Sequence, residues 1–228
     1  GVGYLKFNGF SGSPNAGKAA EAAMNFLANS EALIIDLRQN GGGSPDMIQI
    51  LSSYLYNGDR VHLNDFYYRP ENTTEQRWTL PYVPGKRLGD ADVYVLTSNR
   101  TFSAAEEFTY NLKNLKRATI VGETTGGGAH PGGVISASDK FGIFVPSGRA
   151  INPITHTNWE GTGVEPDVKV SSNDALKEAH YRAVNALAVK HQDDPDNPYA
   201  WTRDQLNVEA HPVTLSTAEM QTYTGTFG

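Results

Sequence analysis

The sequence contains no cysteine in its 228 residues. This absence excludes a disulfide scaffold, an iron–sulfur cluster, a zinc site with thiolate ligands and a cysteine nucleophile. Long apolar runs are also lacking, because the longest, such as residues 32–35 and 93–96, have only the length of a β-strand. A transmembrane helix needs about 20 apolar residues. The sequence therefore predicts no transmembrane segment.

A surplus of basic residues is also absent. The chain has 25 acidic and 19 basic residues, and its formal net charge is −6. Nucleic-acid partners and anionic membrane surfaces attract basic proteins, so we expect neither as a partner. The lysine and hydroxyl of a phosphate-binding P-loop are missing, and no histidine or carboxylate cluster has metal-ligand spacing. We therefore expect no cofactor and no metal.

The hydrophobic pattern alternates between strands and helices along the first half of the chain. Strands are expected at residues 3–8, 32–37, 92–97 and 118–121, and helices at 14–28, from Ser44 onward and at 103–115. Further along, 134–137 and 142–145 are typical of an antiparallel pair, 164–170 of a closing strand and 173–190 of an amphipathic helix. This order predicts the α/β class, with a mixed central sheet flanked by helices.

The acidic, proline-broken stretch at 192–197 marks a domain boundary. We expect residues 1–191 to form one core domain, with 192–228 a linker and the start of a further, β-rich C-terminal element. The chain begins directly with a strand, so we also expect it to be cut from a longer polypeptide, with additional domains at both ends.

Three polar or glycine-rich loops follow three of the expected strands, at residues 38–43, 99–103 and 123–128. Ligands of open α/β sheets gather beyond the carboxyl ends of the strands, so these loops are expected to converge. The consecutive glycines of the first loop leave backbone N–H groups open to an anion. Taken alone, a triple glycine is more often a plain tight turn.

Ser103 stands at an expected strand-to-helix junction. A nucleophilic serine needs such an accessible position, small neighbours and a donor beside it, here the N–H of Ala104. The alternative is purely structural, because Ser103 and Glu106 have the spacing of a helix capping box. On the residues alone, the capping role is favoured.

Four motifs in order resemble those of the tail-specific, or C-terminal-processing, serine proteases. The resemblance spans about residues 2–170 and is nearest to the branch that includes tricorn protease and the interphotoreceptor retinoid-binding protein. The motifs are DLRQNGGG at 36–43, TSNRTFSAAEEF at 97–108, GETTGG at 122–127 and GTGVEPDV at 161–168. The resemblance implies a ClpP/crotonase-like core, cleavage of peptides or unfolded C-terminal tails by a serine, and a periplasmic or secreted location.

Carried over by position, the resemblance places the nucleophile at Ser103. It places the oxyanion hole at the N–H groups of Ala104 and Gly42, with Gly41 as the neighbour to test next. The nucleophile and the helix cap are compatible roles, because a helix N-terminus favours a developing negative charge.

The general base is the position where the family pattern is not matched. The family's lysine falls on Gly128, and the histidine of the tricorn-like branch falls on Lys6. The glutamate of that branch has a match in Glu160. The base therefore lies either before residue 1 or on a histidine of this chain, with His130 the first candidate and His156 the second.

A second function remains open at this level. The retinoid-binding relative uses the same scaffold for apolar ligands, so the chain could be a non-catalytic binding domain for apolar ligands or peptides.

Overall fold

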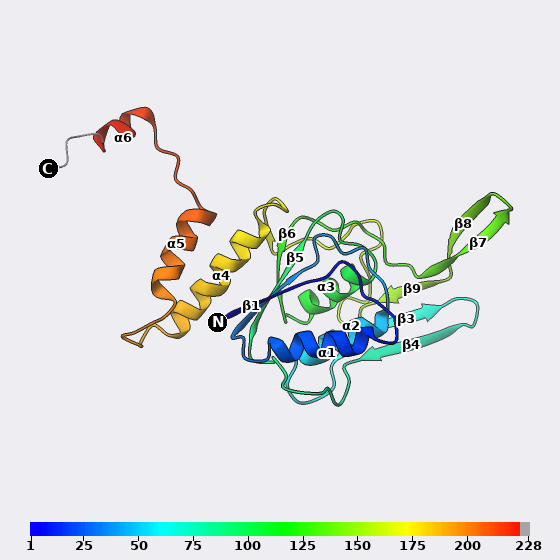
Figure 1. Cartoon of the computed structure of the whole chain (residues 1–228). Helices are drawn as coiled ribbons and strands as arrows, with labels where there is room; N and C mark the ends of the chain where they lie inside the picture. Colours follow the sequence, from blue (N-terminus) through cyan, green and yellow to red (C-terminus); the bar gives the residue numbers. More distant parts are fainter. Residues whose placement is uncertain (224–228) are drawn as a thin grey trace.

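The computed structural model describes residues 1–223 and is built around a five-stranded parallel sheet (Figure 1). The strand order is β1-β2-β5-β6-β10, and each neighbouring pair is parallel. The strands are β1 (Val2–Lys6), β2 (Ala32–Asp36), β5 (Asp92–Thr97), β6 (Thr119–Gly122) and β10 (Val168–Lys169). The α/β class is confirmed, and each expected central strand is present.

Helices cover both faces of this sheet. Leu33 and Ile35 of β2 pack in one core with α1 (Ala16–Phe26), α2 (Pro45–Tyr54) and α3 (Ala104–Asn114), whereas Ile34 packs in a second core with α4 (Ala175–Lys190). Successive side chains of a strand point to opposite faces, so a strand covered on both sides must be apolar throughout. All five residues of β2 are buried for this reason.

The antiparallel strands lie outside the central sheet, which differs from the expected mixed sheet. Three of them form the order β4-β3-β9, and two form the hairpin β7-β8, which projects from the body of the molecule (Figure 1). Their bounds are β3 (His62–Tyr68), β4 (Thr73–Trp78), β7 (Gly132–Ser138), β8 (Phe141–Pro146) and β9 (Gly148–Ile151). Helices lie in the connections from β1 to β2, from β2 to β5 and from β5 to β6, whereas short turns let β3 pair with β4 and β7 with β8.

The segment after α4 continues as helices up to the end of the described residues. α5 (Ala200–Ala210) lies against α4, and α6 (Thr217–Thr222) follows it. His211, at the end of α5, and Glu178, on α4, form an ion pair at 3.0 Å. The β-rich element expected from residue 222 lies largely outside the described residues. Among those described, no helix combines the length and apolar character needed to cross a bilayer.

Candidate active site

The three loops that follow β2, β5 and β6 meet at one edge of the central sheet, as expected. The N–H of Phe102 donates to the carbonyl of Asn40 at 3.0 Å, and the N–H of Gly126 donates to the carbonyl of Thr101 at 3.0 Å. The Thr101 hydroxyl donates to the carbonyl of Leu37 at 2.9 Å. The loop that carries Ser103 is thus bonded to both of its neighbours.

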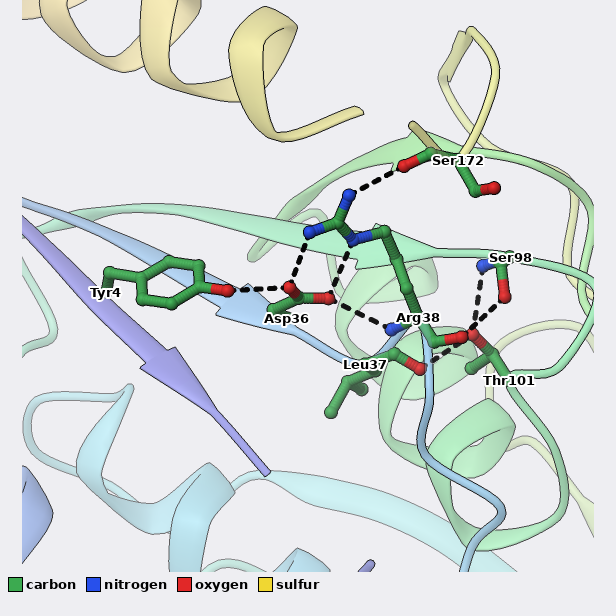
Figure 2. Close-up of polar contacts among 7 residues, drawn as sticks. All are labelled: Tyr4, Asp36, Leu37, Arg38, Ser98, Thr101 and Ser172. Carbon is green, nitrogen blue, oxygen red and sulfur yellow. Dashed lines mark hydrogen bonds and ion pairs between the residues drawn. The ribbon is translucent and has the colours of Figure 1, made fainter. Parts of the chain in front are cut away.

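A buried ion pair anchors the start of the glycine loop (Figure 2). Arg38 donates from Nε to Asp36 Oδ1 at 2.9 Å and from its terminal nitrogen to Oδ2 at 2.7 Å. Tyr4 donates its hydroxyl to the same carboxylate at 2.7 Å. A bidentate guanidinium–carboxylate pair restricts both side chains. The Arg38 carbonyl in turn accepts from the Ser98 hydroxyl at 2.6 Å, which connects the first loop to the second.

The electrostatics of this cluster favour its charged form. Burial by itself would raise the pKa of Asp36, but the hydrogen bonds from Arg38 and Tyr4 outweigh it, and the pKa of Asp36 is lowered. Burial and the hydrogen bond to Asp36 raise the pKa of Tyr4 to about 12. The ion pair therefore stays intact across the neutral pH range.

Gly42 occupies a position that a side chain could not share. Its φ is +104°, and a Cβ built on it would lie 2.7 Å from Ser103 Cβ and 2.9 Å from the nitrogen of Ala104. The turn is held by the fully buried Asn40, whose Oδ1 accepts the N–H of Gly42 at 2.9 Å. The glycine loop therefore lies directly against Ser103 and the first N–H of α3.

Ser103 has a backbone that a capping serine does not need. It is exposed, with φ 54° and ψ −120°, whereas N-cap residues normally have an extended backbone. Ser103 and Glu106 nevertheless form a capping box, in which the Glu106 carboxylate accepts the Ser103 N–H at 2.8 Å. The N–H of Glu106 also donates to the Ser103 carbonyl at 2.9 Å.

Glu106 connects the Ser103 loop to the loop after β6. Its carboxylate is fully buried, and besides the Ser103 N–H it accepts the Thr125 hydroxyl at 2.5 Å. It also accepts the N–H groups of Gly127 at 2.6 Å and Gly128 at 2.9 Å. Four donors satisfy a buried charge that would otherwise be costly. From the sequence, Glu106 is expected only in the capping box, whereas in the structure it is the main connection between the two loops.

A cavity of about 250 Å³ opens beside Ser103. Its polar lining comes from Ser103, the backbone of Ala104 and Gly43, Glu107 and His130, and its apolar side chains are Pro45, Phe66, Ala129, Pro131, Phe144 and Trp159. We name this cavity the Ser103 pocket. In the described part of the chain no group of three metal-ligating side chains is present.

The comparisons with known proteins agree with this geometry. The profile of peptidase family S41 matches residues 1–170. The chain belongs to peptidase family S41. The S41 chain is 32% identical over 174 residues to carboxyl-terminal-processing peptidase 2 of the Arabidopsis thaliana chloroplast, covering 73% of this chain and 31% of that protein.

A second relative, the carboxyl-terminal-processing protease of Synechocystis sp., is 30% identical over 169 residues, covering 73% and 37% of the two proteins. The S41 chain thus spans about a third of the length of the curated relatives it matches. A solved photosystem II D1 C-terminal processing protease aligns with a TM-score of 0.61 and 26% identity, over 75% of this chain and 42% of that one. Mature CPAF aligns with a TM-score of 0.66 at 17% identity, over 85% and 52%, which shows the fold alone.

The structure separates the candidate bases of the S41 chain. His130 lines the Ser103 pocket, and its Nδ1 lies 3.7 Å from Glu160 Oε2. The same Oε2 accepts the N–H of Ala129 at 2.7 Å, so the exposed Glu160 lies at the rim of the pocket. His156 is exposed and does not line the Ser103 pocket.

Gly128 occupies the position of the family's lysine, and in this conformation no side chain fits there. A Cβ built on Gly128 would lie 2.3 Å from the Phe102 ring. The ring therefore occupies the space that a side chain at this position needs. Phe102 was not singled out from the sequence, because nothing local indicates which residue its ring covers.

Proposed function

We propose that this chain is the catalytic core of a serine peptidase in which the Ser103 hydroxyl attacks the carbonyl carbon of a peptide bond. The backbone of Ser103 carries the proposal. A non-glycine residue at φ 54° holds about 1–3 kcal/mol of strain, which the surrounding structure must offset. A helix cap does not require that strain, whereas a nucleophile presented on a sharp strand-to-helix turn does.

The oxyanion of the tetrahedral intermediate is stabilised, in this proposal, by the start of α3 and the glycine loop. The N–H of Ala104 belongs to the first turn, where no intrahelical acceptor exists and the helix dipole favours negative charge. The N–H of Gly42 already donates to Asn40, so a substrate oxygen has to share it. Gly43 lines the Ser103 pocket and replaces Gly41 as the next position to test.

The general base in this proposal is His130, oriented by Glu160. Because Nδ1 lies beside the carboxylate, Nε2 is the ring nitrogen that we assign to remove the Ser103 proton. His130 then passes that proton to the leaving amine as the carbon–nitrogen bond breaks, which leaves an acyl ester on Ser103. A water molecule, deprotonated in turn by His130, hydrolyses the ester and regenerates the serine.

Peptides or unfolded C-terminal tails are the proposed substrates. This part of the proposal is supported by the family and by relatives that are named carboxyl-terminal-processing peptidases. An extended tail reaches an exposed serine beside a small pocket without unfolding of the enzyme, whereas a folded loop does not fit a cavity of about 250 Å³.

A serine-directed fluorophosphonate probe tests the nucleophile. We expect the protein to be labelled, Ser103→Ala to lose labelling completely, and His130→Gln to be labelled at least tenfold more slowly. The matched control is Ser138→Ala on the exposed β7–β8 hairpin, which should label as the wild type does. Absence of labelling in the wild type contradicts the proposal and favours a binding domain.

A further inference from the structure

Glu107 lies one helical turn after Ser103 on α3 and lines the same pocket. Ser103 precedes the helix with a non-helical backbone, so the fold, and not the four-residue spacing, places both residues in the lining of one pocket. Glu107 is only 4% exposed. Among the described residues that line the Ser103 pocket, it carries the one acidic side chain.

The surroundings of Glu107 compensate its burial only in part. Burial raises its pKa to about 8, and the nearby Asn64, Arg77 and Asn111 only partly offset this rise. Asn64 and Asn111 are fully buried, and their hydrogen bonds to Glu107 lower its pKa without cancelling the effect of burial. A buried carboxyl group with so little compensation is costly to ionise.

The neighbouring charges are engaged elsewhere or lie across the cavity. Arg77 on β4 pairs with Asp46 and with Glu75, each at 2.8 Å. Burial raises the pKa of Tyr68 on β3, and the charges of Glu75 and Glu107 add to that rise. His130 faces the same pocket from the loop before β7. A cation that enters the pocket would therefore give Glu107 a counter-charge beyond the partial effect of Arg77.

The size of the pocket limits what that cation can be. About 250 Å³ is below the range of roughly 300–1,000 Å³ that encloses whole small-molecule ligands. It suits one long side chain, whose methylene groups would contact apolar walls such as Phe66, Pro131 and Trp159. A side chain with an apolar stem and a positive end matches a pocket with apolar walls and one carboxyl group.

We propose that Glu107 makes this peptidase select a lysine or arginine as the residue whose carbonyl group Ser103 attacks. The inference rests on the proposed function, because it assigns the Ser103 pocket to a substrate side chain. The cation pairs with the carboxylate inside a poorly solvated cavity, where such a pair is stronger than in water. Because free Glu107 is mostly protonated at pH 7, binding of the cation releases that proton to solvent.

The first test compares two peptides that are identical except for lysine or norleucine on the amino side of the cleaved bond. Norleucine retains the apolar stem and lacks the ammonium group. We expect the kcat/KM ratio of lysine to norleucine to rise with pH from 6.5 to 9 and to exceed ten at pH 9. Titration of the general base cancels in this ratio, because both peptides use the same base.

The variant Glu107→Gln retains the size of the side chain and loses its charge. We expect its lysine-to-norleucine ratio to be near one at every pH, because the ammonium group that distinguishes the two peptides has lost its charged partner. The exposed Glu71→Gln is the matched control and should retain the lysine preference. A wild-type ratio near one, or an unchanged ratio in Glu107→Gln, overturns the inference.

The second test does not depend on catalysis. Calorimetric titration of Ser103→Ala with the two peptides at pH 7, in buffers of different ionisation heat, measures affinity and proton release together. We expect tighter binding of the lysine peptide with release approaching one proton, and neither effect after Glu107→Gln is added. Lysine preference in binding without any hydrolysis by the wild type contradicts only the peptidase proposal. Hydrolysis without lysine preference contradicts only the assignment of Glu107.

Discussion

Small residues surround Ser103 on several sides. Gly42 lies so close that a methyl group on it would overlap Ser103 Cβ at 2.7 Å, and Ala104 and Ala105 follow in the first turn of α3. This crowding holds the strained backbone of Ser103 while leaving its side chain exposed. The proposed reactivity of Ser103 therefore depends on the small size of the neighbouring side chains.

Glu160 is the residue through which the proposed base can be tested separately from the nucleophile. In Glu160→Gln one oxygen still accepts the N–H of Ala129, but the negative charge 3.7 Å from His130 is lost. We expect kcat to fall at least tenfold with KM and folding nearly unchanged, because an orienting carboxylate stabilises the protonated base in the transition state. Steady-state kinetics and the fluorophosphonate labelling rate measure this effect.

The exposed Glu165→Gln is the control for that substitution and should have wild-type kinetics. Equal turnover of Glu160→Gln and wild type would exclude a catalytic contribution of Glu160 and leave His130 without an orienting partner.

At the scale of the element, the first turn of α3 concentrates three functions. Ser103 stands at the N-cap, Glu106 at the third position connects the adjoining loop, and Glu107 faces the pocket. Acidic residues in the first turn also interact favourably with the helix dipole. The helix therefore fixes the relative positions of the proposed nucleophile, the loop connection and the pocket carboxyl group within one turn.

Glu106→Gln tests the connection between the two loops. The carboxylate accepts the N–H groups of Ser103, Gly127 and Gly128 on its two oxygens. An amide has only one accepting oxygen, so its NH₂ group would face N–H donors that can no longer be accepted. We expect a loss of roughly 2 kcal/mol or more in the free energy of unfolding, because buried hydrogen bonds to a charge are lost. Turnover should fall more than tenfold, since Ser103 loses its fixed backbone.

Urea unfolding and fluorophosphonate labelling measure the two effects on Glu106→Gln. The control is Glu209→Gln, which changes an exposed carboxylate on α5. If Glu106→Gln has wild-type stability and labelling, the four hydrogen bonds do not hold the site.

At the scale of the whole molecule, the central sheet divides the apolar interior into two cores, and a third small cluster lies under the Ser103 pocket. That cluster contains Phe66, Ala129, Ala150, Trp159 and Val164. The pocket is thus supported by strands of the antiparallel sheet and by the loops after β6, and not by the parallel sheet alone. Ionisation of the buried Glu107 in this pocket therefore lowers the free energy of unfolding of the whole domain.

The pH dependence of unfolding tests this cost through Glu107. Its pKa is raised from 4.5 to about 8 in the folded state, so the folded protein retains a proton that the unfolded chain releases. Stability from this group is fully present below pH 4.5 and is lost as the pH rises toward 8, by at most about 1.4 kcal/mol per unit. Glu107→Gln removes the effect.

We expect the variant to gain stability relative to wild type between pH 5 and 8, with the difference levelling above pH 8. Urea unfolding of both proteins at each pH measures it, and other titrating groups cancel in the difference. A difference that does not change with pH would mean that Glu107 titrates normally in the folded protein.

Much of the local structure follows from short-range patterns. The apolar runs of β2 and β5 predict buried strands because a strand covered on both faces has no polar side. Ser44 and Pro45 predict the start of α2, and Ser44 does accept the N–H of Asp46 at 3.3 Å. The motifs of the three loops resemble those of the family, and this resemblance assigns the nucleophile to Ser103, whereas the residues alone favour a helix cap there. Strand β9 and the helices α5 and α6 were not predicted.

Tertiary structure alone decided which groups meet across those loops. The donors of Glu106 at Thr125 and Gly127 lie about twenty residues along the chain, and the Phe102 ring covers Gly128 from another loop. Burial raises the pKa of Glu107, and two of the residues that partly offset this rise, Asn64 and Arg77, belong to β3 and β4, which are distant from α3 in the sequence. Strand and helix periods are properties of one segment, whereas hydrogen bonds, clashes and desolvation depend on distances between segments that only the folded chain sets.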